Sequence, residues 1–165
     1  MAAYDEIYAA KIKRNQGKLF FHIREVLPDA DEKWFIEKYM KSDIRRLLDS
    51  ANPKLAAKPA PELLSAFINR ECGGEYKRGE EWGGFLTQWV GEIYSLYQWK
   101  FNVPSAELID ILPLSDMERM YIPGHQMGWM RLLIKYTLFY SLMLENSSYS
   151  KYKKVSISNL RNWLF

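Results

Sequence analysis

The sequence is poor in the residues from which metal and disulfide sites are built. Its 165 residues include one cysteine, Cys72, and two histidines, His22 and His125. A structural zinc site needs four Cys or His ligands, so one protomer cannot supply it. A single cysteine excludes an intramolecular disulfide and is typical of a reducing compartment. We therefore expect a cytoplasmic protein without a bound metal.

Long hydrophobic segments are also lacking. The longest apolar run, 132–144, is interrupted by Lys135 and is shorter than the ~20 apolar residues that a membrane span needs. The first residues, Met1 to Glu6, show no basic segment followed by an apolar run, so we expect no signal peptide. The sequence therefore predicts no membrane partner.

Motifs of common enzyme classes are absent as well. We find no Gly-x-Ser-x-Gly, dinucleotide-binding, Walker or His-Glu-x-x-His pattern. The segment Gly73 to Gly84 is rich in glycine, but no predicted strand precedes it and no Gly-Lys-Ser/Thr is present. A phosphate-binding loop needs both features. We therefore predict a mobile loop there, and no cofactor.

The sequence is rich in apolar residues at helical spacing. Its apolar fraction is 48% and its aromatic fraction 15%, which is typical of a folded chain. Either Asp29 or Asp31 is suited to begin one helix, Ser42 to begin another and Pro113 to end one. We predict an all-α fold, bundle-like or orthogonal, forming one compact domain over residues 1–165. It would have about six to eight helices around segments 85–101 and 127–144.

Four positions lead to expectations about packing. Ile7 and Ile12 keep helical spacing with later apolar residues and predict one buried face. Gly91 lies inside a helix, where glycine costs about 1 kcal/mol relative to alanine, so we expect a close approach of another backbone. Trp99 lies on the polar side of the same helix, so it is either covered by another segment or exposed to a partner.

A pair of arginines follows the predicted helix start at Ser42. Arg45 and Arg46 lie between Asp43 and Asp49. Such a series is typical of a solvated helix face whose charges pair with one another. We therefore expect Lys41, Arg45, Arg46 and Asp49 on the outer side.

The C-terminal tail, 149–165, differs from the rest of the chain in charge. The net charge of the whole chain is +3, but residues 131–165 carry six basic residues and one acidic residue. Basic and aromatic side chains alternate in the tail: Tyr149, Lys151, Tyr152, Lys153, Lys154, Arg161, Trp163. This pattern suits weak nucleic-acid binding. The apolar end, Trp163 to Phe165, would either dock on the body or bind another chain.

One constellation has the residue types of acid–base catalysis. His125 follows Pro123-Gly124, where we expect a turn that fixes the side chain and leaves it accessible. Histidine transfers protons near neutral pH, and the carboxylate of Glu92 could hold its tautomer, with Tyr121 and Arg119 nearby. The alternative is a structural His125 that bonds a nearby backbone group.

The spacing of Arg119 and His125, with five residues between them, resembles the Arg-x(4–6)-His signature of HEPN ribonucleases. The resemblance implies a helical dimer in which two such motifs meet at a cleft and the histidine takes part in RNA cleavage. It covers this segment only. Met120, where the family has a polar residue, and the helix-breaking Pro123-Gly124 depart from the family pattern.

A broader resemblance covers most of the chain before the predicted 127–144 helix. It rests on Trp34 to Arg45, Trp89 to Tyr94 and Tyr121 to His125. These segments look like those of a family of small, all-helical bacterial proteins with no established activity. The resemblance implies a bacterial accessory protein of toxin–antitoxin or mobile-element character.

Three functions are compatible with these observations. We rank first a non-enzymatic protein-interaction or regulatory module, antitoxin-like or a mobile-element accessory, which binds another protein or a second copy through Trp99, Trp163 and Phe165. The second is a HEPN-like ribonuclease that uses Arg119 and His125. The third is a nucleic-acid binder that uses the basic tail, above all Lys151, Lys153 and Lys154.

Overall fold

The computed structural model describes residues 2–125, which form nine α-helices and one π-helical turn and contain no strand. The prediction of an all-α fold is confirmed. The predicted helix 127–144 and the tail 149–165 lie outside the described residues. The helices are α1 (Glu6–Phe21), α2 (Ile23–Val26), α3 (Glu32–Met40), α4 (Asp43–Leu48), α5 (Pro53–Ala56), α6 (Ala60–Phe67), α7 (Gly84–Phe101), α8 (Ser105–Ile111) and α9 (Leu114–His125).

The chain divides into two units after Tyr121. Residues up to Tyr121 form the first unit, and only the last turn of α9 belongs to the described part of the second. The description below concerns the first unit. That the whole chain forms one domain stays a prediction.

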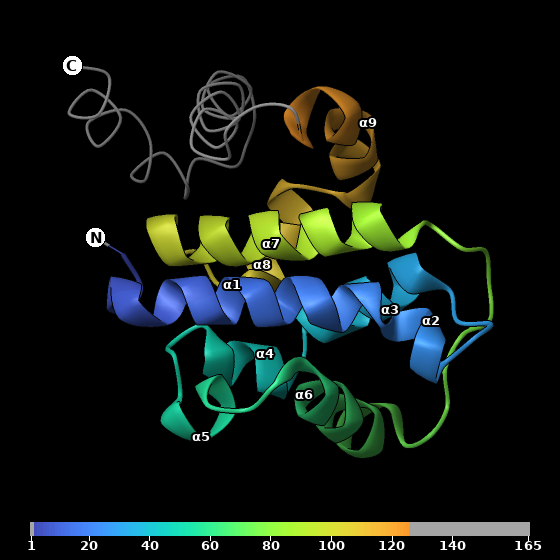
Figure 1. Cartoon of the computed structure of the whole chain (residues 1–165), viewed down its shortest axis with the longest axis horizontal. Helices are drawn as coiled ribbons and strands as arrows, with labels where there is room; N and C mark the ends of the chain where they lie inside the picture. The colour runs from blue at the N-terminus through green and yellow to red at the C-terminus, as the bar shows by residue number, and fades with distance from the viewer. Residues whose placement is uncertain (1, 126–165) are drawn as a thin grey trace. The chain divides into compact units, whose positions relative to one another are not determined.

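The first unit is built on the antiparallel pair α1 and α7, which lie side by side (Figure 1). Their backbones approach closely at Gly17 and Gly91. A Cβ atom added to Gly91 would lie 2.8 Å from the carbonyl oxygen of Gln16 and 3.0 Å from Cα of Gly17. This contact explains why glycine occupies a helix interior, and it confirms the predicted close approach.

A row of buried aromatic rings joins α1 to α3 and α6. Phe20 of α1 packs edge-to-face on Tyr39 of α3, with ring centroids 5.5 Å apart. Tyr39 and Phe35 both pack on Phe67 of α6, at 5.3 and 5.0 Å. Edge-to-face pairs add about 0.5–1.5 kcal/mol to the free energy of burying their surface. These ring contacts thus hold α3 and α6 together and against α1.

Local signals in the sequence set several helix ends. Of the two candidate caps Asp29 and Asp31, Asp31 accepts a hydrogen bond from the Trp34 N–H. Ser42 accepts one from the Arg45 N–H, as predicted. The π-helical turn Ile68–Cys72 ends at Gly73, whose φ of 60° lies in the left-handed region that glycine adopts easily.

Pro123-Gly124 does not turn the chain as predicted. The backbone of α9 passes through both residues and ends at His125. A proline inside a helix removes one hydrogen bond and favours a bend, but the following turn can still form. The helix therefore ends later than the proline signal suggested.

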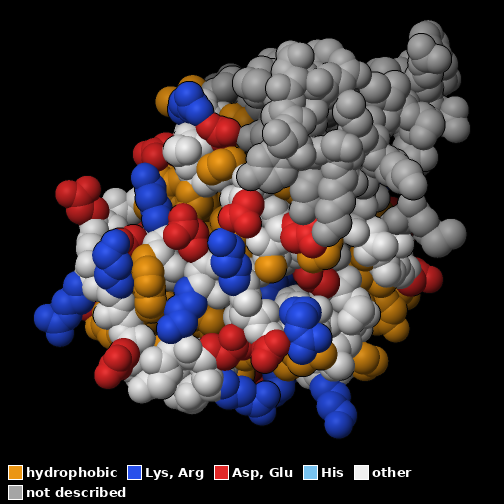
Figure 2. Space-filling view, turned by 180° about the vertical axis from the view of Figure 1, so that it is seen from behind, with side chains coloured by type: hydrophobic (Ala, Val, Ile, Leu, Met, Phe, Trp, Pro, Cys, Tyr) orange, Lys and Arg blue, Asp and Glu red, His pale blue; other side chains and the backbone are white. Residues whose placement is uncertain are grey.

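Charges of both signs are interspersed on the face turned away from the viewer in Figure 1, as Figure 2 shows. Ion pairs connect neighbouring helices. Lys33–Glu118 at 2.9 Å links α3 to α9, and Lys41–Asp110 at 3.1 Å links the end of α3 to α8. Exposed pairs of this kind contribute about 0–1 kcal/mol each. None of the helices in residues 2–125 has the length and apolarity that a membrane-spanning segment requires.

Candidate functional site

Trp99 is covered by the N-terminal segment of the same chain. Its side chain is 8% exposed, and its indole N–H donates a 2.8 Å hydrogen bond to the carbonyl oxygen of Tyr4. The Ala3 N–H donates to the Trp99 carbonyl oxygen, also at 2.8 Å. Of the two alternatives for Trp99, the structure thus shows that another segment of the chain covers it. Trp99 is therefore not available to bind a partner, and a binding surface must be sought among other residues.

The four residues of the predicted acid–base constellation make different contacts. Glu92 on α7 faces α1, where its carboxylate lies 3.3 Å from Nζ of Lys13. Tyr121 packs edge-to-face on Trp89 at 5.6 Å. Arg119 is exposed and forms an ion pair with Asp116. The side chain of His125 lies outside the described residues.

These contacts give the predicted catalytic roles no support. Glu92 is engaged by a lysine from another helix, and Arg119 by an aspartate one turn away. The tail residues Lys151, Lys153, Lys154, Trp163 and Phe165 also lie outside the described residues. Within the described part of the chain, His, Cys, Asp and Glu side chains form no group of three that could hold a metal ion.

The lone cysteine lies at the end of the π-helical turn. Cys72 is buried, and this burial raises the pKa of its thiol above the usual value, although Lys38 opposes the shift. Thiolate is the reactive form, so a raised pKa suppresses nucleophilic chemistry at neutral pH.

The glycine-rich loop before α7 is tied to residues 29–32, contrary to the expectation of a mobile loop. The Tyr76 hydroxyl donates to Asp29 at 2.7 Å, and Nζ of Lys77 lies 2.8 Å from Asp31. The buried carboxylate of Glu32 accepts hydrogen bonds from the N–H groups of Trp82, at 2.5 Å, and Gly83, at 3.1 Å. The backbone donors at the start of α7 thus already have an anion from the protein itself.

Arg45 lies in the interior and not on the outer side where it was predicted. Its side chain is 0% exposed. Nε donates to the hydroxyl of Ser105 at 2.8 Å, and Nη2 lies 3.3 Å from a carboxylate oxygen of Asp49. The Ser105 hydroxyl in turn donates to Asp49 at 2.5 Å. One buried charge pair thereby joins α4 to the start of α8.

Asp49 is the connecting point of this buried polar centre, which consists of Arg45, Asp49 and Ser105. Its second carboxylate oxygen accepts the Ser105 N–H at 2.8 Å, and its carbonyl oxygen accepts from Gln98 of α7 at 3.1 Å. A buried charge must be paired and hydrogen-bonded to avoid a large desolvation cost. The ion pair with Asp49 and the hydrogen bond from Nε offset part of this cost, although Nη1 and Nη2 of Arg45 make no hydrogen bond to any residue that the structure describes. These contacts connect α4, α7 and α8.

Two tyrosines flank the buried polar centre. Burial raises the pKa of Tyr39 to about 12 and that of Tyr4 to about 12, against the opposing influence of the positive Arg45. Both hydroxyls therefore stay protonated at any physiological pH. The centre has the features of a structural element, and neither tyrosine beside it exchanges protons near neutral pH.

The surface that stands out is the side of α1 opposite the core. At 100° per residue, five residues fall within about 40° of Ile7. We call them the outer stripe of α1: Ile7, Lys11, Arg14, Lys18 and Phe21. The buried residues Ile12, Gln16 and Leu19 lie on the opposite side.

The outer stripe is apolar at its ends and basic in the middle. Ile7 is 76% exposed, contrary to its predicted place in the core, because Ile12 and Leu19 set the buried face of α1 and Ile7 lies outside it. At the other end Phe21 packs on Phe85 of α7 with centroids 5.7 Å apart, and Phe85 is 75% exposed.

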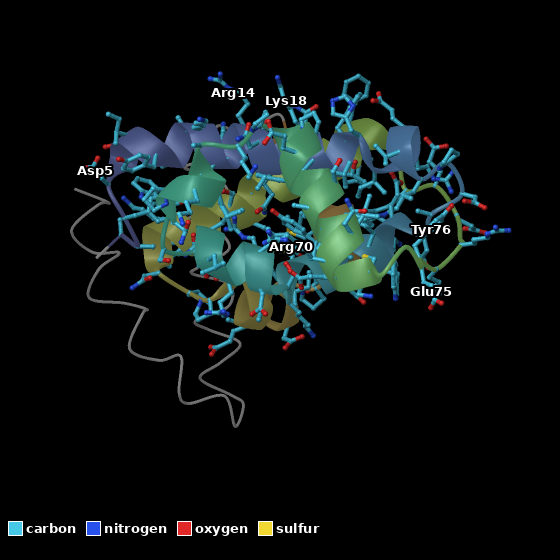
Figure 3. All side chains as sticks on the ribbon, turned by 90° about the horizontal axis from the view of Figure 1, so that it is seen from below. Asp5, Arg14, Lys18, Arg70, Glu75 and Tyr76 are labelled. Atoms are coloured by element: carbon cyan, nitrogen blue, oxygen red, sulfur yellow. The ribbon has the colours of Figure 1, made fainter. Side chains whose placement is uncertain are left out.

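The middle of the outer stripe carries unpaired positive charge. Arg14 and Lys18 form no ion pair with any acidic residue that the structure describes. Both project outward from α1 in Figure 3. Lys11 donates a hydrogen bond to the carbonyl oxygen of Ala57, which does not neutralise its charge. A helical wheel of α1 places these residues on one side but does not show that this side is exposed.

Comparison with known proteins returned no relative: neither a family model, nor a curated protein, nor a solved structure matches this chain. The fold and the contacts of its side chains therefore carry the functional argument.

Proposed function

We propose that this protein is a non-enzymatic interaction module of the cytoplasm, and that the outer stripe of α1, together with Phe85, is the surface that binds another protein. The observation that carries the proposal is the exposure of two apolar side chains: Ile7, near the start of α1, and Phe85 of α7, which packs on Phe21 at the end of α1. Single exposed apolar residues are common. Two of them on either side of a row of unpaired cations form a surface with a defined direction and length.

Other features agree with an interaction role. Cys72 is suppressed as a nucleophile, and Arg119 and Glu92 are each held by another side chain. A helix exposed along one side and fixed to the core along the other presents its side chains with little loss of backbone freedom on binding. The surface replaces Trp99 as the main support for the interaction hypothesis.

Affinity capture with matched variants tests the proposal. The tagged full-length protein is expressed in its native cell, and bound proteins and nucleic acids are both identified by mass spectrometry and sequencing. Ile7→Ser and Phe85→Ser should each remove the same captured protein. Val26→Ser serves as the control, because Val26 is 51% exposed and lies outside the outer stripe.

Each result has a defined meaning. A stoichiometric protein lost with Ile7→Ser and Phe85→Ser, but retained with Val26→Ser, supports the proposal, and a toxin among the captured proteins would specify the regulatory role. Capture that is indifferent to all three variants contradicts it. Recovery of RNA that is cleaved by the wild type and not by His125→Ala would establish the HEPN-like alternative.

A further inference from the structure

We propose that the partner presents an acidic amphipathic helix of about four turns, with apolar residues at both ends and carboxylates between them. This inference rests on the proposed function, because it names the kind of partner that the same surface binds. It is argued from the charge, the length and the end residues of the outer stripe.

The charge of the outer stripe is local. Lys11, Arg14 and Lys18 supply three positive charges to one side of α1, and no acidic residue belongs to the stripe. Residues 1–125 as a whole carry 17 basic and 19 acidic side chains, a net charge of −2. Since the Debye length is about 8 Å at physiological ionic strength, a ligand in contact with α1 responds chiefly to the stripe itself.

The spacing of the stripe matches a helix. Ile7 and Phe21 are 14 residues apart, which corresponds to about 21 Å along the helix axis at 1.5 Å per residue. The three cations follow one another at intervals of three and four residues. A partner helix lying along α1 would place carboxylates at the same intervals, and its apolar residues would contact Ile7 at one end and Phe21 with Phe85 at the other.

A protein helix fits this surface better than a nucleic acid does. Phosphate contacts would use only the three cations and would leave Ile7 in water. Nucleic-acid affinity grows with the number of phosphates neutralised, and three cations on a unit of net negative charge neutralise few. An acidic helix uses the cations and both apolar ends at once.

The test is a selection from a displayed library of 16-residue helix-forming peptides, with the full-length protein as bait. Enriched peptides should carry net negative charge in their central turns and apolar residues near both ends. The double variant R14E/K18E should lose this enrichment. Arg70→Glu is the control, since Arg70 is exposed and lies apart from Arg14 and Lys18 in Figure 3.

Affinity for one enriched peptide gives the quantitative result. Loss of an exposed ion pair weakens binding up to about fivefold, and reversal adds repulsion, so R14E/K18E should weaken binding about tenfold or more. Arg70→Glu should change it less than twofold. Because the basic tail is unchanged in every bait, weaker binding of R14E/K18E cannot be attributed to the tail.

Three results of the peptide selection would overturn the inference: no enriched peptide, enriched peptides that are neutral or basic, or acidic enrichment that survives R14E/K18E. None of these affects the proposed function, which is tested by capture and by the apolar variants. A captured protein that requires Ile7 and Phe85 but has no acidic helix would leave the proposed function standing and refute the inference.

Discussion

Removal of the buried arginine is the perturbation with the clearest expected effect on stability. In Arg45→Leu, the carboxylate of Asp49 keeps its bonds from Ser105 but loses its buried cationic partner. The Asp49 side chain is 15% exposed, so water replaces the guanidinium poorly. The variant therefore leaves an uncompensated charge in the interior.

The magnitude follows from that charge. Breaking a buried ion pair by removing one partner costs about 3–5 kcal/mol, a large fraction of the roughly 5–15 kcal/mol that stabilises a domain. In a domain of this size each kcal/mol changes the melting temperature by about 2–4 °C. We expect Arg45→Leu to melt roughly 6–20 °C below the wild type.

Urea unfolding followed by circular dichroism measures the change in the free energy of unfolding. The neighbouring Arg46→Leu is the control, because Arg46 is exposed and pairs with Asp43 on the surface; its cost should stay within about 0.5 kcal/mol. The double variant R45L/D49L should be less destabilised than the sum of its single variants, since it removes both charges.

Equal stability of Arg45→Leu and Arg46→Leu would refute the reasoning. So would strict additivity of R45L and D49L, which would show that the two side chains contribute independently. Either result would mean that the buried polar centre does not fix α4 against α8.

Two further predictions concern the core. In Gly91→Ala, the added methyl group would overlap the backbone of α1. Such overpacking costs about 1–3 kcal/mol, more than the ~1 kcal/mol gained in helix propensity. We therefore expect a lower urea midpoint, and an unchanged or higher midpoint would contradict the close approach. At alkaline pH, burial keeps the pKa of Tyr39 near 12 in the folded protein, against about 10 when unfolded. Its contribution to stability is therefore complete below pH 10 and is lost as the pH rises toward 12. Tyr39→Phe should lose less stability over this range, and equal losses in chemical denaturation would show that Tyr39 ionises freely.

The sequence allows the helices to be predicted where the signal is local. The cap at Asp31 and the restart at Ser42 each depend on a few adjacent residues, and both are found in the structure. The close approach at Gly91 is also predictable, because glycine weakens a helix interior and is kept there where a larger side chain would not fit.

Features that depend on distant residues are not predictable in this way. Arg45 looks like a surface residue next to Arg46, but its buried partners include Ser105, sixty positions away, as well as the nearby Asp49. Trp99 is covered because residues 3 and 4 return to the end of α7. Pattern alone cannot supply such long-range contacts.

The candidate surface escapes prediction for a related reason. The spacing of Ile7 to Ile12 fits a helix and suggests a core position for both, but the buried face of α1 is set by the residues that meet α7 and α3. The basic residues of the outer stripe stand out less in the sequence than the more basic C-terminal tail. For Ile7 and for the basic residues of the outer stripe alike, the sequence does not show which side of α1 is covered by other helices.

Site-specific photo-crosslinking in the native cell tests the central claim most directly. A benzophenone amino acid replaces Ala10, an exposed residue beside Ile7 and Arg14, so every residue of the outer stripe is kept. The matched control replaces Ala106, an exposed alanine on α8. We predict a covalent adduct with another protein from position 10 and none from position 106. An adduct from position 106 alone, equal adducts from both positions, or no protein adduct from position 10 would contradict the account.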